Sequence, residues 1–122
     1  MIDNLITEDV TIIVPTKNWS NFLYRLLNYY AIAGFKGDIL IGDASNDNFL
    51  RENVQIISDF HSKISVKHFI NNIGVNETIE ILAEKIETTY CLQCNDDDFV
   101  VPNGIAKSLI FLKEKSGNLI KI

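Results

Sequence analysis

The sequence predicts an α/β domain: a mainly parallel, Rossmann-like sheet flanked by helices. Short apolar runs of strand length alternate along the chain with segments of helical periodicity. Alternation of this kind favours right-handed crossovers and a parallel sheet with helices on both faces. The third run, "ISVKHF" (64–69), alternates apolar and polar residues, which is typical of a half-exposed edge strand. The third strand is therefore expected at the edge, which gives the strand order 3-2-1-4.

The first half of the chain is expected to form two strands and two helices. A β-branched run at 10–15 ("VTIIVP") predicts the first strand, and "DILIG" (38–42) predicts the second. Asn18 is expected as the N-cap of the first helix and Gly34 as its C-terminal stop. The second helix is expected over 48–60. The apolar residues that predict the two helices are Trp19, Phe22, Leu23, Leu26, Leu27 and Tyr30, then Phe49, Val54, Ile57 and Phe60.

The second half repeats the alternation. A third helix follows the edge strand, and "YCLQC" (90–94) predicts a fourth strand. Pro102 suits the first turn of a fourth helix. The run "NLIKI" (118–122) is typical of the start of another strand. The apolar positions that predict these helices are Val75, Ile79, Leu82, Ala83 and Ile86, then Ile105, Leu109 and Leu112.

Length, composition and charge indicate one globular domain over residues 1–122. The chain is 47% hydrophobic and carries a net charge of −5, which argues against a nucleic-acid partner because such proteins need a basic face. No apolar run is long enough to span a bilayer, since "FLYRLLNYYAIAGF" contains Arg25 and Asn28. The N-terminus lacks a secretion signal pattern. We therefore expect a cytoplasmic, soluble domain.

Cys91 and Cys94 form a C-x-x-C pattern, which raises the possibility of a zinc or redox site. A zinc site needs four ligands, and the chain has no second cysteine pair. Both cysteines fall in a predicted strand, where residues three apart point to opposite faces. They are expected to be two small buried side chains.

Polar clusters directly follow three of the predicted strands. They are Thr16-Lys17-Asn18, the segment 43–47 ("DASND") and the segment 95–98 ("NDDD"). In the order 3-2-1-4, strands one, two and four end together at one edge of the sheet, where α/β proteins bind ligands. Such residues are also common in turns and helix caps, so this alternative stays open for each cluster.

Within these clusters, the strongest indication of a bound ligand comes from Asp96, Asp97 and Asp98. Three adjacent carboxylates stay ionised only near a positive charge, and no Lys or Arg lies within eight residues. A bound Mg²⁺ or Mn²⁺ would supply that charge and keep open positions for phosphate oxygens. Phosphate-binding glycine loops of the usual patterns are absent.

Four segments in order resemble the successive blocks of the family 2 glycosyltransferases, which have the GT-A fold. They are "VTIIVPTKN", "ILIGDASND", "NNIGVNETIEILAE" and "YCLQCNDDDFVVP", and the resemblance covers about residues 9 to 115. It implies binding of a nucleotide-diphosphate sugar, with a UDP-sugar favoured, and transfer of the sugar to a hydroxyl of a saccharide or other acceptor. It also implies a divalent metal, Mn²⁺ or Mg²⁺, on the diphosphate.

The resemblance also implies roles for particular residues. Pro15, Thr16, Asn18 and Asp43 would surround the base and ribose. Asn72, Gly74 and Asn76 match the family's loop and helix start beside the nucleotide, although a turn and N-cap would explain them equally. The metal-binding "DxD" motif maps onto Asp96-x-Asp98, with Asp96 and Asp97 also beside the nucleotide. Asp98 and Asp96 are favoured as metal ligands, and Asp97 is the close alternative.

The sequence departs from the family pattern in two ways. The paired acids expected after the second strand are reduced to Gly42-Asp43. The chain also ends after the nucleotide-binding half, so the catalytic base and acceptor site are expected in a missing half, and no residue here is assigned as catalytic. His61 and His68 are expected away from the site, as surface or packing residues.

These observations lead to two hypotheses. The first is the donor-binding half of a metal-dependent glycosyltransferase, which would transfer little sugar by itself. The second is a non-catalytic binding or assembly module on the same fold, motivated by the missing half and by Asn95 in the acidic block. Nucleotidyltransferases and receiver domains place their glycines or acids after the first strand, where this chain has neither. Apolar surface near Ile120 and Ile122 predicts self-association.

Overall fold

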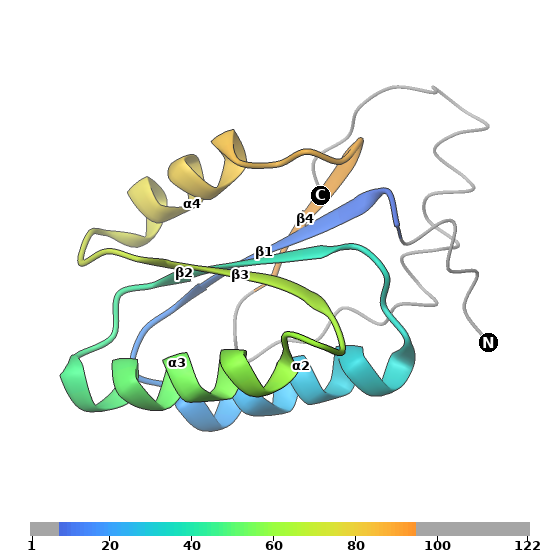
Figure 1. Cartoon of the computed structure of the whole chain (residues 1–122). Coiled ribbons are helices and arrows are strands. Elements are labelled where there is room, and N and C mark those ends of the chain that lie inside the picture. Colours follow the sequence, from blue (N-terminus) through green and yellow to red (C-terminus); the bar gives the residue numbers. More distant parts are fainter. Residues whose placement is uncertain (1–7, 95–122) are drawn as a thin grey trace.

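The computed structural model describes residues 8–94, which form a parallel sheet with helices on both faces (Figure 1). The strands of this part are β1 (Val10–Thr16), β2 (Asp38–Asp43), β3 (Ser65–Ile70) and β4 (Tyr90–Gln93). They lie in the order β3-β2-β1-β4, and every neighbouring pair is parallel. The predicted fold class and strand order are confirmed.

The strand registers bring the carboxyl ends of the strands to one edge of the sheet. Thr16 at the end of β1 pairs with Asp43 at the end of β2, and Asp43 pairs with Ile70 at the end of β3. β4 runs parallel to β1, and its last residue, Gln93, pairs with Ile13. We call this side, where the strands end, the carboxyl edge. The strand order reverses between β1 and β4, and crevices at such points bind ligands in α/β proteins.

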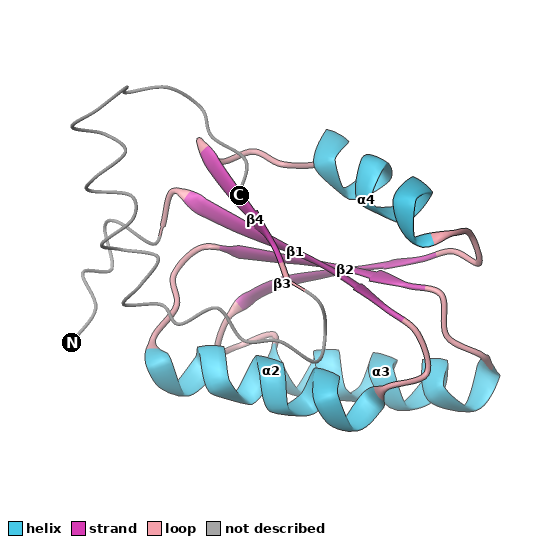
Figure 2. Ribbon diagram, turned by 180° about the vertical axis from the view of Figure 1, so that it is seen from behind, coloured by secondary structure: helices cyan, strands magenta, loops and turns pink. Residues whose placement is uncertain are grey.

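Within residues 8–94, two helices cover one face of the sheet and one covers the other. Helices α2 (Ser20–Ala33) and α3 (Asp47–Phe60) lie side by side on one face, and α4 (Val75–Glu84) lies on the opposite face (Figures 1 and 2). None of the helices within residues 8–94 is long and apolar enough to cross a membrane.

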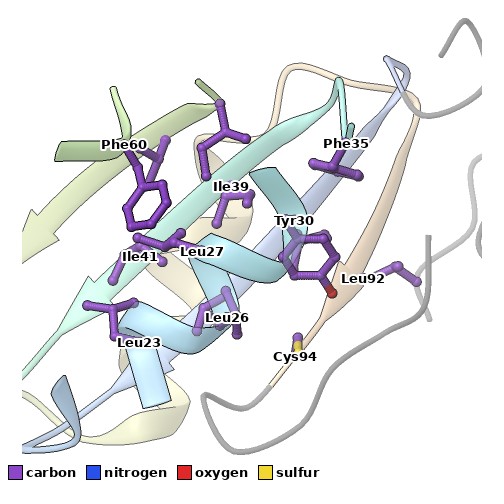
Figure 3. Close-up of a cluster of buried hydrophobic side chains, with 14 of the residues drawn as sticks. Leu23, Leu26, Leu27, Tyr30, Phe35, Ile39, Ile41, Phe60, Leu92 and Cys94 are labelled. Carbon is purple, nitrogen blue, oxygen red and sulfur yellow. The ribbon is translucent and has the colours of Figure 1, made fainter. Parts of the chain in front are cut away.

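The larger hydrophobic core lies between the sheet and helices α2 and α3 (Figure 3). Its α2 members are Leu23, Leu26, Leu27 and Tyr30, which are fully buried. A smaller cluster on the other face joins Ile13, Leu40 and Leu82. Because β1 is covered on both faces, its residues are buried throughout, and this explains its continuous apolar run. Burying each large aliphatic side chain contributes about 1.5–3 kcal/mol.

The boundaries of α2 confirm one predicted cap and correct the other. Gly34 ends the helix in the left-handed conformation, with φ 78°, as expected for a C-terminal glycine. The predicted N-cap, Asn18, is wrong: the helix begins at Ser20, Trp19 holds the N-cap position, and no side chain caps it. Asn18 instead lies before the helix with φ 55° and bonds to a neighbouring loop.

Helix α3 buries a different face from the one that its apolar residues predict. Ile57 and Phe60 are buried as expected, but Phe49 and Val54 are 39% and 48% exposed. Asn53 is fully buried in their place, one turn before Ile57. An apolar pattern passes over asparagine, whereas hydrogen bonds allow this residue to enter the interior. Helix α4 shows a similar shift, with Thr78 buried and Val75 exposed.

The remaining predicted elements lie outside the described residues. These are the fourth helix, the strand at 118–122, the segment 95–98 and the apolar surface near Ile120 and Ile122. The extent of the domain and its self-association stay predictions. Cys91 and Cys94 are described, and both are buried as expected.

Candidate functional site

Two loops meet at the carboxyl edge of the sheet. The loop after β1 covers residues 17–19 and the loop after β2 covers residues 44–46, and we call them the rim loops. The backbone N–H of Ala44 donates to the carbonyl of Thr16 at 3.0 Å. The predicted polar clusters after the first two strands are therefore in contact, and the third cluster lies outside the described residues.

Asn18 joins the two rim loops. Its backbone N–H donates to the Oγ of Ser45 at 2.8 Å, and its side-chain Oδ1 accepts the N–H of Asn46 at 2.8 Å. The positive φ of Asn18 is a conformation that asparagine tolerates better than most residues. These two hydrogen bonds hold the residue in that conformation, so Asn18 fixes the spacing of the loops.

Asp43 is the polar centre beneath the rim loops. Its side chain is fully buried at the end of β2. The Oδ1 accepts the backbone N–H of Ser45 at 2.9 Å. The Oδ2 accepts the Nδ2 of Asn53 at 2.9 Å and the Nε2 of His68 at 2.8 Å. A buried carboxylate needs partners of this kind, because an unpaired one would be strongly destabilising.

These partners decide the charge of Asp43. Burial raises the pKa of the carboxyl, but the hydrogen bonds from His68, Ser45 and Asn53 outweigh it and hold the pKa below its ordinary value of 3.8. Asp43 is therefore ionised near neutral pH and can only accept hydrogen bonds. It follows that the Nε2 of His68 carries the hydrogen.

The lowered pKa of Asp43 predicts a loss of stability in acid. Because the folded chain binds this proton less readily than the unfolded chain, the contribution of Asp43 is fully present above about pH 3.8 and is lost as the pH falls through the lowered pKa. Urea unfolding of the wild type and of Asp43→Asn between neutral pH and about pH 2 tests this. We expect the stability difference between the two chains to be constant near neutrality and to shrink below about pH 3.8; a difference independent of pH would contradict the assignment.

Asn53 and Ser20 extend the network into the two helices. The Oγ of Ser20, the first residue of α2, donates to the Oδ1 of Asn53 at 2.7 Å. The Nδ2 of Asn53 also lies 3.3 Å from the Oγ of Ser45. These partners fix the orientation of the Asn53 amide, because its oxygen faces a hydroxyl donor and its nitrogen faces a carboxylate. Both helices are thus connected to the carboxyl edge.

The prediction that both histidines lie away from the site is wrong for His68. His68 lies on β3 with its side chain 12% exposed, and it contacts Asp43 directly. The edge strand predicts a surface or packing residue away from the rim, but His68 lies on the sheet face that α3 covers, as Val66 does, and there it reaches Asp43. His61 is exposed beyond the end of α3, as expected.

A hollow of about 420 Å³ opens beside the rim loops, on the α4 face of the sheet. Predicted site residues Pro15, Thr16 and Gly74 line it. The sequence analysis missed Trp19 as a site residue, although it is 42% exposed and forms one wall. Its assignment to the helix face concealed this role. The other lining residues are Lys17, Gly42, Ala44, Ile73, Val75 and Thr78.

Gly42 has no space for a side chain. A Cβ at this position would overlap the Cγ2 of Thr78 and lie 3.1 Å from the Cδ1 of Leu82. The backbone of β2 therefore packs directly against α4. The family pattern that the sequence resembles has two adjacent acids after the second strand, whereas this chain has Gly42-Asp43. An acid at position 42 would displace α4, and this gives a physical reason for the glycine.

A second hollow, of about 360 Å³, lies beside the loop after β2. It is lined by Asp43, Ser45, Asn46 and Asp47, with Leu50, Ile70, Asn71 and Asn72. Asn72 is exposed there, and the buried Oδ1 of Asn71 lacks a hydrogen-bond partner within the described residues. Asn76 is exposed on α4 and lines neither hollow.

The described residues do not form a metal centre. Within residues 8–94, no three His, Cys, Asp or Glu side chains are grouped so that they could hold an ion. The predicted metal ligands Asp96 and Asp98, and the alternative Asp97, lie outside that range. Metal binding therefore stays a prediction that depends on those three residues.

The described part of the chain shares its α/β fold with several solved structures. Solved structures that share it include those of S. aureus TarS (TM-score 0.71, 19% identity), TarS 1-349 (0.72, 20%) and TarS 1-349 in complex with UDP (0.71, 19%). Each match covers 87% of this chain, but only 20% of the first TarS chain and 32% of the other two. This chain thus spans a third or less of the TarS chains. Identity this low shows the fold alone.

Comparisons of sequence add nothing to the likeness in structure. No family model matches the chain, and no curated protein matches it. Membership of glycosyltransferase family 2 accordingly stays a prediction.

Proposed function

We propose that the chain binds the nucleotide-sugar donor of a glycosyltransferase, with a UDP-sugar as the favoured donor. The observation that carries this proposal is the hollow of about 420 Å³ at the carboxyl ends of β1 and β2. Its volume is within the range of small-ligand sites, about 300–1,000 Å³. It lies outside the carboxyl ends of parallel strands, the edge of the sheet at which α/β proteins bind ligands. The complex of TarS 1-349 with UDP, on the same fold, supports the choice of nucleotide.

The lining of the hollow suits a nucleoside. Trp19, Ile73 and Val75 provide apolar walls on which a base ring can pack. Pro15 and Thr16 would lie against the base and ribose, and Lys17, which also lines the hollow, would supply a positive charge near the phosphates. Asn18 and Asp43 would act by holding the rim loops, and Asn72 would approach from the neighbouring hollow.

The reaction that we propose for the whole protein is transfer of the sugar to an acceptor hydroxyl. A Mn²⁺ or Mg²⁺ ion held by Asp98 and Asp96, with Asp97 as the alternative, would supply charge neutralisation for the diphosphate. The residues of this chain would bind and orient the donor. No residue within the described range 8–94 is proposed as the base that deprotonates the acceptor.

Thermal unfolding with UDP, with Mn²⁺ and with both tests the proposal. A ligand at a hundred times its dissociation constant adds about 2.7 kcal/mol, which raises the melting temperature by several degrees for a domain of this size. We expect the largest shift with nucleotide and metal together. In Asp98→Ala the metal-dependent part should be lost, and in Trp19→Ala the shift from UDP itself should shrink.

Ile32→Ala is a matched control, because Ile32 is 79% exposed on α2 and lines neither hollow. Its shift should equal that of the wild type. Absence of any shift with UDP, GDP or TDP would contradict donor binding and favour the non-catalytic binding module.

A further inference from the structure

We propose that His68 is a positioning residue for the nucleotide pocket: through Asp43 it fixes the two rim loops that line the pocket. The inference rests on the proposed function, since a nucleotide is what the loops would hold. Its physical basis is a continuous series of hydrogen bonds from β3 to the loop after β1.

The series begins at the edge strand. The Nε2–H of His68 donates to the Oδ2 of Asp43 at 2.8 Å, and the Oδ1 of the same carboxylate accepts the N–H of Ser45 at 2.9 Å. The side chain of Asp43 is 0% exposed and that of His68 is 12% exposed, so water competes little for these bonds. Hydrogen bonds to an ionised carboxylate are stronger than bonds between neutral groups.

From Ser45 the series crosses to the other loop. The Oγ of Ser45 accepts the N–H of Asn18, and the Oδ1 of Asn18 accepts the N–H of Asn46. Asn18 has a positive φ, so its loop conformation depends on these bonds. Its neighbours Lys17 and Trp19 both line the hollow, as does Ala44 on the second loop. A change at His68 would therefore reach both walls of the pocket.

Without His68, the Oδ2 of Asp43 would lose one of its two hydrogen-bond donors. The Oδ2 of Asp43 has two donors, the Nε2 of His68 and the Nδ2 of Asn53. Asn53 also approaches Ser45 at 3.3 Å, so its amide hydrogens are shared between two acceptors. Without the imidazole, the carboxylate is free to turn toward Asn53. Such a turn would release the N–H of Ser45.

The test compares His68→Phe, His68→Gln and His61→Gln with the wild type. Phenylalanine keeps a ring but removes the donor, whereas glutamine places an N–H donor at a similar distance from the backbone. His61→Gln is the matched control, because His61 is an exposed histidine outside the network. Two quantities are measured for each chain: the dissociation constant for UDP, and the hydrogen-exchange rate of the backbone amides of Ser45 and Asn18.

We expect His68→Phe to weaken UDP binding about tenfold, the factor that a loss of 1.4 kcal/mol produces. The amides of Ser45 and Asn18 should exchange about tenfold faster, while core amides such as that of Ile39 stay unchanged. His68→Gln should restore most of both quantities, and His61→Gln should change neither. A purely structural role would instead accelerate core and loop exchange together.

Wild-type measurements keep the inference testable if His68→Phe does not fold. The ¹⁵N shifts of the imidazole at mildly alkaline pH should show the hydrogen on Nε2; a hydrogen on Nδ1 alone would overturn the proposal. Unchanged Ser45 exchange in His68→Phe would also overturn it. If the wild type does not bind UDP, the proposed function fails, and the exchange rates alone decide whether His68 positions the loops.

Discussion

Asp43→Ala should destabilise the chain by about 3 kcal/mol or more, a large share of the roughly 6–18 kcal/mol expected for a domain of this length. The substitution removes the acceptor of three donors, the N–H of Ser45, the Nδ2 of Asn53 and the Nε2 of His68. Each buried donor left unpaired costs about 1–3 kcal/mol, although water entering the space would recover part of this. Urea unfolding measures the difference directly.

Asp38→Ala is the matched control on the same strand. Asp38 begins β2, and its Oδ1 accepts one exposed hydrogen bond, from the Oγ of Ser65 at 2.8 Å. Its loss should cost less than about 1 kcal/mol, because water replaces an exposed partner easily. Equal costs for the two variants would refute the view that Asp43 holds the carboxyl edge together.

Gly42→Ala should destabilise the chain by about 1–3 kcal/mol, the usual cost of adding a methyl group to a closely packed interior. The new Cβ would overlap the Cγ2 of Thr78, so α4 would have to move away from β2. Because Gly42, Gly74 and Thr78 all line the hollow, UDP binding should weaken in the same variant. Urea unfolding and a UDP titration measure the two effects.

Thr78→Ser supplies the control for this second prediction. Serine lacks the Cγ2 but keeps the hydroxyl, which in threonine donates to the carbonyl of Gly74 at 2.9 Å. The double variant Gly42→Ala, Thr78→Ser should therefore recover at least half of the lost stability. Strict additivity of the two single changes would mean that the contact does not limit position 42, since residues in contact are expected to couple.

The sequence predicts the fold well because local signals and burial agree. The apolar runs at β1 and β2 are continuous because both strands are central in the sheet, and the alternating run at β3 marks an edge. Gly34 ends α2 where its left-handed conformation requires it. Each of these signals depends on the position of a residue within its own element, which a sequence records directly.

The site was predicted less completely, because its polar residues act through partners far along the chain. Asn53 and His68 lie 10 and 25 residues from Asp43, yet both donate to the same carboxylate oxygen. An apolar pattern passes over Asn53, and an edge strand predicts a surface or packing histidine at position 68, away from the rim. The residues that follow the strands did indicate the edge of the sheet where the rim loops meet.

The sequence by itself determined the α/β class, the strand order 3-2-1-4 and the edge of the sheet where polar residues gather, since periodicity and strand-end residues are local properties. Only the tertiary structure decided how that edge is held together. Parallel pairing places the ends of β2 and β3 next to each other and brings α3 beneath them, so that Asp43, Asn53 and His68 meet in the interior. Such a network depends on distances between elements, and these are set by packing.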